Sequence, residues 1–475
     1  MRRIRNTVVL GVVGLVGILA LVGAAVLLLV DPNAHKARVE AAASQALGLE
    51  VGIAGRLTMH ILPGLHMLLE DVQVRNRGVD VASAKEAAVD IDLMSLLGKD
   101  VQIHKIVLKH VVIAIERDRD GRFNFQKETT ASESLLAREW PALTLSEAAI
   151  TYTDQRFGNR FEASDCQVAV RDLRHAGGQP SSFFSGLAFT ADLACRTARK
   201  DAVTVSDLKV TADAKAGIVE LKPVTAHAFG APGSGSVHAD YTGPAPAYQI
   251  AYALPQFSID EFLKAMSMKG VASGRMDLSA NLSTQGHTVK DLLQTMKGKV
   301  SLRGKGLTFS GGDLDREFAE FESSQTFDLV DVGAVLLAGP LGLLVTKGYD
   351  FASISQGAPG SSEIRALVSD WTIERGVARA EDVAMATKEN RVALRGGVDW
   401  VNDRFDDVTI ALIDAKGCVK VQQKIRGTLQ QPVVEKPSLL KSLTGPAVRL
   451  LKKGSELLLG DRCEVFYTGS VAAAR

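Results

Sequence analysis

The segment RMDLSANLS, residues 275–283, carries the pattern that decides the fold. Apolar and polar residues alternate along it, with Met276, Leu278, Ala280 and Leu282 between Arg275, Asp277, Ser279, Asn281 and Ser283. Successive side chains of a β-strand point to opposite faces of the sheet. The alternation therefore predicts a strand with one apolar face and one wet face.

The same alternation recurs along most of the chain, in short segments bounded by Gly, Pro, Asn or Asp. Expected strands include residues 71–75, 89–93, 110–116, 202–210, 217–221, 236–241, 248–254 and 299–309. Helical patterns are few, at 34–47 before Gly48, at 260–268, at 288–296 and at 313–323. Such a series predicts a mainly β fold with some helix (α+β), in a long antiparallel sheet rather than a doubly wound parallel one.

An uncharged apolar run, VVLGVVGLVGILALVGAAVLLLV, occupies residues 8–30. At about 1.5 Å per residue, a helix of this length reaches roughly 35 Å, enough to cross a hydrocarbon core of about 30 Å. A cleaved signal peptide has a shorter apolar core followed by small residues, whereas this run ends in Leu-Leu-Leu-Val. We therefore expect a single transmembrane anchor, whose apolar surface includes Val8, Leu15, Leu21 and Val30.

The charges that flank the anchor predict its orientation. Arg2, Arg3 and Arg5 precede the run, and Asp31 follows it. Basic residues stay on the cytoplasmic side, so the N-terminus is expected in the cytoplasm and the remaining chain across the membrane.

The net charge excludes some functions, and the residue pattern suggests several regions. A formal charge of +1 over 475 residues implies no nucleic-acid partner, because phosphate binding needs clustered Lys and Arg. The pattern divides the chain into an N-terminus with anchor at 1–30, a β region at 31–127, a central β-strand repeat region at 128–310, a second β region at 311–437, and an amphipathic helix with a tail at 438–475. The helix at 438–459 fits a membrane surface and the end of a sheet equally well.

The four cysteines have no Cys-x-x-Cys spacing, which excludes the usual zinc-ribbon and thioredoxin signatures. They are Cys166, Cys195, Cys418 and Cys463. In an exported domain they can form two disulfides, and the preferred connectivity is local, 166 with 195 and 418 with 463. The alternative is four free thiols, buried as small apolar groups.

No catalytic constellation is present in the sequence. It lacks a Gly-x-Ser-x-Gly elbow, a His-Glu-x-x-His pair, a phosphate-binding loop and a Gly-x-Gly-x-x-Gly after a strand. Residues 118–124, DRDGRFN, resemble half of a calcium loop but lack the later ligands, so a hairpin turn is expected there. We therefore predict no enzyme, no cofactor and no metal site.

Two further stretches need an interpretation. The Gly-rich residues 233–236 follow no helix-opening signal and are expected to form a loop. Residues 329–345 are apolar, but they contain Asp331, three Gly and Pro340, so a second membrane span is not expected. A buried insertion and an apolar element facing lipid both remain open for them.

The order of these features is similar to that of the AsmA family of bacterial envelope proteins. The matching segments are the anchor, the helix up to Gly48, VGIAGRL at 51–57, PGLHMLLEDVQVRN at 63–76, residues 93–97 with VQIHKIVLKHVVIAIERDRDGRFN at 101–124, GGDLD at 311–315, NRVALRGGVDW at 390–400 and GTLQQP at 427–432. The family often has Thr-Gly-Arg where this chain has Leu47, Gly48 and Leu49. The regions 31–127 and 311–437 are the AsmA-like ones.

The resemblance implies a single-pass inner-membrane protein of a Gram-negative cell, with a periplasmic body folded as a long, curved β-groove. Larger relatives are thought to move glycerophospholipids towards the outer membrane, so membrane phospholipids and an envelope protein are the expected partners. Two functions follow: a carrier or conduit for phospholipid between the membranes, or a non-catalytic scaffold that assists outer-membrane protein assembly and envelope organisation. Candidate lipid-facing residues are Ile250, Met276, Leu278 and Leu282.

Overall fold

The computed structural model describes most of the chain after the predicted anchor. The described residues are 32–60, 64–92, 103–126, 138–155, 158–175, 186–201, 203–265, 272–310, 312–324, 336, 360–429, 431–435, 438–439 and 465–473. Among them, no helix combines the length and the apolar character that a membrane crossing requires. The predicted anchor, with Val8, Leu15, Leu21 and Val30, lies outside these residues.

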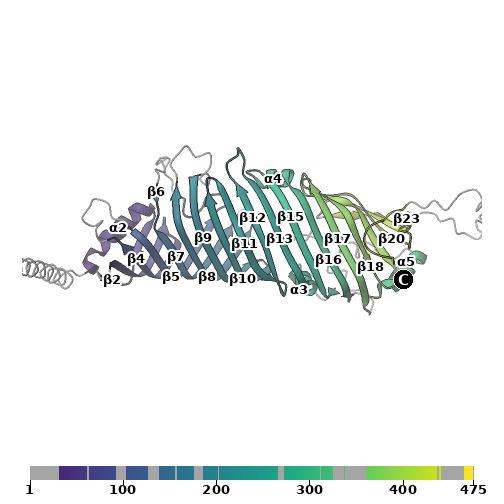
Figure 1. Cartoon of the computed structure of the whole chain (residues 1–475), viewed down its shortest axis with the longest axis horizontal. Coiled ribbons are helices and arrows are strands. Elements are labelled where there is room, and N and C mark those ends of the chain that lie inside the picture. Colours follow the sequence, from purple (N-terminus) through teal and green to yellow (C-terminus); the bar gives the residue numbers. More distant parts are fainter. Residues whose placement is uncertain are drawn as a thin grey trace, which may run out of the picture. The chain divides into compact units, whose positions relative to one another are not determined.

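The described chain is mainly β (Figure 1). It divides into two compact units. The first unit comprises Met1–Gly177 and Ala191–Asp201, and the second comprises Gly178–Thr190 and Ala202–Arg475. The division falls inside the predicted region 128–310. Elements of the first unit are η1 (Pro32–His35), α2 (Lys36–Leu47), β1 (Glu50–Ile53), β2 (Leu57–His60), β3 (Leu65–Asn76), β4 (Val79–Ile91), β5 (Ile103–Arg117), β6 (Arg138–Glu139), β7 (Ala142–Asp154), β8 (Asn159–His175) and most of β9 (Leu187–Lys200).

The sheet of the first unit contains a parallel pair that the sequence did not predict. β1 and β2 both pair with β3, and antiparallel pairing continues from β3 to β4 and β5. β5 and β7 are parallel, with Lys105 opposite Ala142 and Arg117 opposite Asp154. The expectation of a wholly antiparallel sheet is therefore wrong here. The chain between Arg117 and Ala142 is long enough to return to the other end of the sheet, as a parallel pair requires.

The hairpin expected at residues 118–124 is present at the start of this connection. The backbone N–H of Gly121 donates to the carbonyl oxygen of Asp118 over 3.1 Å, and Arg117 and Phe123 form an antiparallel bridge. The N–H of Arg122 also donates to Oδ1 of Asp118 over 2.8 Å. Asp118 thus stabilises the turn with its side chain, which is a common role of aspartate in turns.

Helix α2 protects the edge strand β1 of the first unit. Ser44 Oγ accepts from the N–H of Val51 over 2.9 Å, and Glu40 Oε1 accepts from the N–H of Ile53 over 2.8 Å. Unpaired strand edges invite association with other chains, and these side chains occupy the free donors. The helix ends as expected at Gly48, whose left-handed φ of 66° lets its N–H bond the Ser44 carbonyl.

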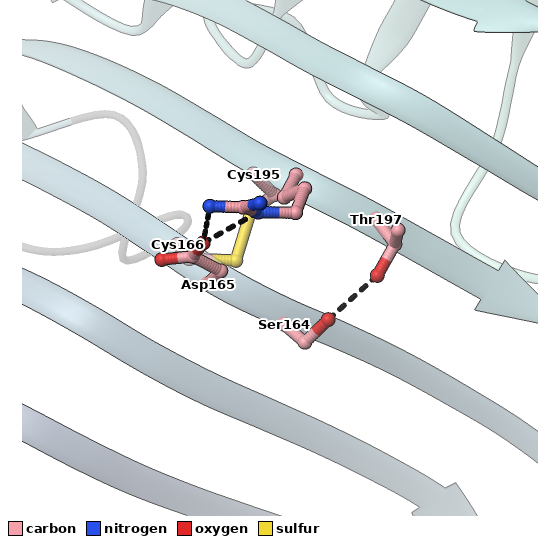
Figure 2. The surroundings of a disulfide bond; sticks show 6 residues. Ser164, Asp165, Cys166, Cys195 and Thr197 are labelled. Carbon is pink, nitrogen blue, oxygen red and sulfur yellow. Dashed lines mark hydrogen bonds and ion pairs between the residues drawn. A yellow bond between two sulfur atoms is a disulfide. The ribbon is translucent and has the colours of Figure 1, made fainter.

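A buried disulfide joins β8 and β9 in the first unit. Cys166 and Cys195 are 0% and 3% exposed and are bonded to each other. Figure 2 shows the neighbouring pair Ser164 and Thr197, whose hydroxyls lie 2.6 Å apart. Cys418 is also disulfide-bonded. Cys463 of the second expected pair lies outside the described residues.

Several strands in both units contain bulges at acidic residues with positive φ. Glu147, Asp165, Asp207 and Asp407 have φ between 50° and 52° and lie at or next to breaks in the pairing register. Aspartate is enriched among the non-glycine residues that adopt this conformation. A bulge bends its strand and increases the local twist, so these positions shape the sheets locally.

The second unit is a series of long antiparallel strands (Figure 1). Its strands are β10 (Val203–Lys215), β11 (Ile218–Ala228), β12 (Ala231–Asp240), β13 (Ala247–Ser258), β14 (Ala272–Ser273), β15 (Arg275–Gln285), β16 (Lys297–Phe309), β17 (Ser362–Glu374), β18 (Val377–Ala386), β19 (Arg391–Asp399), β20 (Arg404–Ile413), β21 (Val419–Gly427), β22 (Pro432–Val434) and β23 (Ser438–Leu439). The expected helices are confirmed as α3 (Ile259–Ala265), α4 (Val289–Thr295) and α5 (Leu314–Ser324). β13 pairs with β15, while the short β14 pairs with β16.

The main core of the second unit lies on one face of its sheet. Trp371, Phe257 and Phe318 are at most 1% exposed and belong to one cluster, together with Leu336. Phe318 comes from α5, so this helix covers part of the sheet face. Of the apolar stretch 329–345, only Leu336 is described, and it is fully buried.

The GGDLD and NRVALRGG motifs meet at the start of α5. Asp315 Oδ1 accepts from Nδ2 of Asn390 over 2.8 Å and from the hydroxyl of Thr387. The hydroxyl of Ser362 accepts from the N–H of Leu314 over 2.7 Å. These bonds satisfy polar groups at the first turn of α5 and attach the helix to β17 and to the turn between β18 and β19.

A C-terminal segment, residues 465–473, packs on the opposite face of β17–β20. Phe466, Tyr467 and Val471 lie against a strip of small side chains: Ala384, Ala386, Ala393 and Ala411. Tyr467 donates its hydroxyl hydrogen to Asp382 over 2.5 Å, and Arg391 Nη1 donates to the Val471 carbonyl over 2.8 Å. The helix expected at 438–459 lies outside the described residues, except that Ser438 and Leu439 form strand β23.

Asp382 is the main polar attachment of this segment. Burial opposes ionisation of the carboxyl, but hydrogen bonds from Ser470 and Tyr467, helped by Arg303, outweigh it and hold the pKa below its ordinary value of 3.8. The carboxylate therefore stabilises the folded state above that ordinary value, and the contribution is lost as the pH falls through the lowered pKa.

Removing the Cys166–Cys195 disulfide is expected to destabilise the first unit. The double variant C166A/C195A should lose roughly 3 kcal/mol of unfolding free energy, because the unfolded chain gains the freedom of an open loop. Urea unfolding of the full-length protein measures the loss. S164A is the control, since it removes only an exposed hydrogen bond next to the disulfide and should cost less than about 1.5 kcal/mol. Equal losses in both variants would contradict the role given to the disulfide.

Acid is expected to loosen the C-terminal segment. Hydrogen exchange at the Ser470 amide, which donates to Asp382 over 3.0 Å, should accelerate below about pH 4 beyond the intrinsic change. D382N should exchange fast at pH 7 and show little further dependence on acid. D406N is the control, because Asp406 is paired with Arg379 rather than with this segment. An unchanged pH profile in D382N would refute the assignment.

Candidate functional site: an open apolar face

Apolar side chains form rows across the strands of the second unit. One row runs from Ala212 in β10 through Leu221 and Val237 to Ile250 in β13 and Leu282 in β15. Each residue is directly opposite the next in the pairing register, so all five side chains lie on one face of the sheet. We call the part of this face formed by β10–β13 and β15 the open apolar face.

The exposure of these rows falls sharply towards β17. Ile250 is 37% exposed and Leu282 is half-buried, whereas Ile373, further along the same row, is 1% exposed. A second row shows the same change, from half-buried Tyr252 to Trp371 at 1%. One apolar face therefore forms a closed core at one side and an accessible surface at the other.

Helices α3 and α5 account for part of this difference. Leu263 of α3 and Phe318 of α5 are at most 1% exposed and pack in the core cluster that also contains Met276. Ile250 belongs to none of the buried clusters of the described residues. The open apolar face therefore begins where these covering side chains end.

The four predicted lipid-facing residues have different surroundings. Ile250 is exposed, and Leu278 and Leu282 are half-buried at the margin of the core cluster. Met276 is 1% exposed and lies inside that cluster. Its burial makes Met276 a core residue, so only the other three can contribute to an accessible apolar surface.

Two tyrosines border the open apolar face, and the sequence analysis did not single them out. The rings of Tyr241 and Tyr248 meet edge to face with centroids 6.1 Å apart. Burial, followed by the hydrogen bond with Tyr248, raises the pKa of Tyr241 to about 12. The Tyr241 hydroxyl is thus neutral at ordinary pH. Rings of this kind suit the boundary between apolar and wet surroundings. The sequence feature that could have identified them is a pair of tyrosines on either side of the turn at residues 242–247.

The Gly-rich residues 233–236 are part of strand β12, so the expectation of a loop is wrong. A Cβ at Gly233 would lie 2.1 Å from the hydroxyl of Tyr252, and one at Gly235 would lie 2.2 Å from the Ala251 carbonyl oxygen. The glycines are needed because the neighbouring strand packs its tyrosine across them.

The chemistry available on this face is apolar. Its rows carry aliphatic and tyrosine side chains, and within the described ranges no three His, Cys, Asp or Glu side chains gather as metal ligands would. Such a surface can bind an apolar molecule by removing it from water.

Comparison with known proteins gives one match. The model of the AsmA family matches residues 1–195, while no curated protein and no solved structure matches the chain. The open apolar face starts after the matched region, in strand β10. The family is generally associated with the bacterial envelope. Residues 1–195 of this protein are therefore similar to the AsmA family.

Proposed function

We propose that this protein is a membrane-anchored periplasmic protein that binds phospholipid on the open apolar face and carries it between the inner and outer membranes. The observation behind the proposal is the graded exposure of continuous apolar rows, from 37% at Ile250 to 1% at Ile373. A face that served only as a core would be covered along its whole length.

The dimensions suit an acyl chain. The row from Ala212 to Leu282 crosses five strands, which at about 4.8 Å spacing extend roughly 19 Å. One leaflet of a hydrocarbon core is about 15 Å thick, half of the whole. Each methylene removed from water on this surface contributes about 0.8 kcal/mol, so a bound chain gains several kcal/mol.

The tyrosine pair suggests where the lipid headgroup lies. Tyr241 and Tyr248 present ring surface to the apolar face and hydroxyl groups beside it. A lipid whose chain follows the row at Ile250 would place its polar end near these hydroxyls or in water. No charge needs to be buried in this arrangement.

The compartment follows from two features. The apolar run at 8–30 is proposed as a single inner-membrane anchor, and the buried Cys166–Cys195 disulfide fits an oxidising compartment such as the periplasm. The body is proposed to act without catalysis. A partner protein in the envelope would complete the path to the outer membrane.

A photo-crosslinking residue at Ile250 should capture phospholipid in living cells. Ile250 is exposed on the apolar face, so an acyl chain there would lie within contact distance. Mass spectrometry of the purified adduct measures the outcome. The control is the same residue at Ala253, which is exposed three residues further along β13 on the opposite face and should give far less lipid.

The result also separates the scaffold from the carrier. Absence of a lipid adduct at Ile250, or equal adducts at both positions, would refute the lipid role. An adduct with the mass of a protein at Ile250 would favour the scaffold for envelope assembly instead.

An acidic substitution on the apolar face should reduce lipid binding without unfolding the protein. I250E places a charge where the acyl chain would lie, at a site that is already partly wet, and should lower copurifying phospholipid severalfold. Lipid analysis of the full-length protein in a mild detergent measures it, with A253E on the opposite face of β13 as the matched control. Equal lipid recovery in a folded I250E protein would contradict the proposal.

A further inference from the structure

A hollow of about 740 Å³ lies in the second unit. It extends over β12, β13 and β15 to the start of β16 and the end of α4, elements that lie side by side in Figure 1. Tyr248, Ile250 and Leu282 contribute to its lining, and its polar lining includes Ser236, His238, Gln249, Asn281, Ser283 and Lys297. By strand alternation, the side chains of these six polar residues are on the face opposite the open apolar face.

Small residues of β13 form the floor of the hollow. Ala251 lies directly between Ser236 of β12 and Asn281 of β15. Ala247, two residues before Gln249 and therefore on the same face of β13, also lines the hollow. A methyl side chain between longer neighbours leaves space above the sheet. The hollow therefore follows from the small side chains in β13.

The hollow presents hydrogen-bonding groups that no protein atom uses. The side chains of Gln249, Asn281 and Ser283 have no hydrogen-bond partner among the described residues. Two amides and a hydroxyl together supply both donors and acceptors. A ligand rich in hydroxyl groups could satisfy them.

Two lysines add positive charge at one side. Lys297 and Lys299 are two residues apart in β16, so both ammonium groups are on this face, directly opposite Ser283 and Asn281. Both are exposed, and neither has an ion-pair partner within the described ranges. The carboxylate at the other side of the hollow, Glu220, is engaged with His238 Nδ1 at 2.5 Å. The free charge of the hollow is therefore positive.

We propose that this hollow binds a phosphate group carried on a hydroxyl-rich unit, such as glycerol phosphate. Lys297 and Lys299 attract the phosphate as point charges, while Gln249, Asn281 and Ser283 bind the hydroxyls. The ligand could be free in solution or be the exposed headgroup of phosphatidylglycerol. Its polar side chains lie on the other face of the sheet from the side chain of Ile250, so the proposal does not depend on lipid binding at the open apolar face.

The test is calorimetric titration of the full-length protein, in a polyoxyethylene detergent at low salt, with glycerol phosphate as the probe. The double variant K297A/K299A should bind roughly tenfold more weakly, and binding by the natural protein should weaken as salt is added. K305A is the matched control, because Lys305 is exposed on the same face of β16 but lies six residues beyond Lys299, further from the hollow that Lys297 lines. Its affinity should stay within about twofold of the natural protein.

A second variant tests the hydroxyl contacts. N281A should weaken binding of glycerol phosphate severalfold while leaving binding of inorganic phosphate almost unchanged. No binding of glycerol phosphate by the natural protein, or an equal loss in K305A and K297A/K299A, would overturn the proposal, as would equal effects of N281A on both probes.

Vesicles distinguish the two sources of the ligand. Stronger lysine-dependent binding to phosphatidylglycerol vesicles than to phosphatidylcholine vesicles assigns the site to a lipid headgroup. Lysine-dependent binding of free glycerol phosphate without that preference assigns it to a soluble ligand. Because the free probe has no acyl chain, failure here leaves the crosslinking result at Ile250 unaffected.

Discussion

The register between neighbouring strands is the constraint on which the second unit depends. It places Ala212, Leu221, Val237, Ile250 and Leu282 directly beside one another on a single face. A slip of one residue in any pairing would turn that strand's apolar side chains to the wet face. The closed core, the open apolar face and the polar hollow all follow from this one register.

The side chains that pack over the apolar face decide which part of it becomes core. Around Trp371 the face is covered, with Phe318 of α5 and Leu336 among the buried residues of the same cluster. At Ile250 the same pattern continues but 37% of the residue remains accessible. The stability of the fold and the proposed binding of lipid thus use the same interaction, the removal of apolar surface from water.

Side-chain hydrogen bonds protect the backbone where strand pairing ends. Ser44 and Glu40 of α2 accept from N–H groups of edge strand β1, and Asp382 accepts from the N–H of Ser470 in the C-terminal segment. Such bonds satisfy polar groups that would otherwise be exposed or unpaired. Both contacts join residues distant in sequence or in different elements, so neither is visible in a local pattern.

Local patterns in the sequence predicted many of the strands, the helix that ends at Gly48, the Asp118 turn and the mainly β class, because period, caps and turn residues are local properties. It also determined which side chains share a face. Only the tertiary structure decided that β5 and β7 are parallel, that Gly233 and Gly235 lie in a strand opposite Tyr252, and that Met276 is core while Ile250 is accessible. Alternation specifies the face on which a side chain lies, whereas the burial of that side chain depends on contacts between residues far apart in the chain.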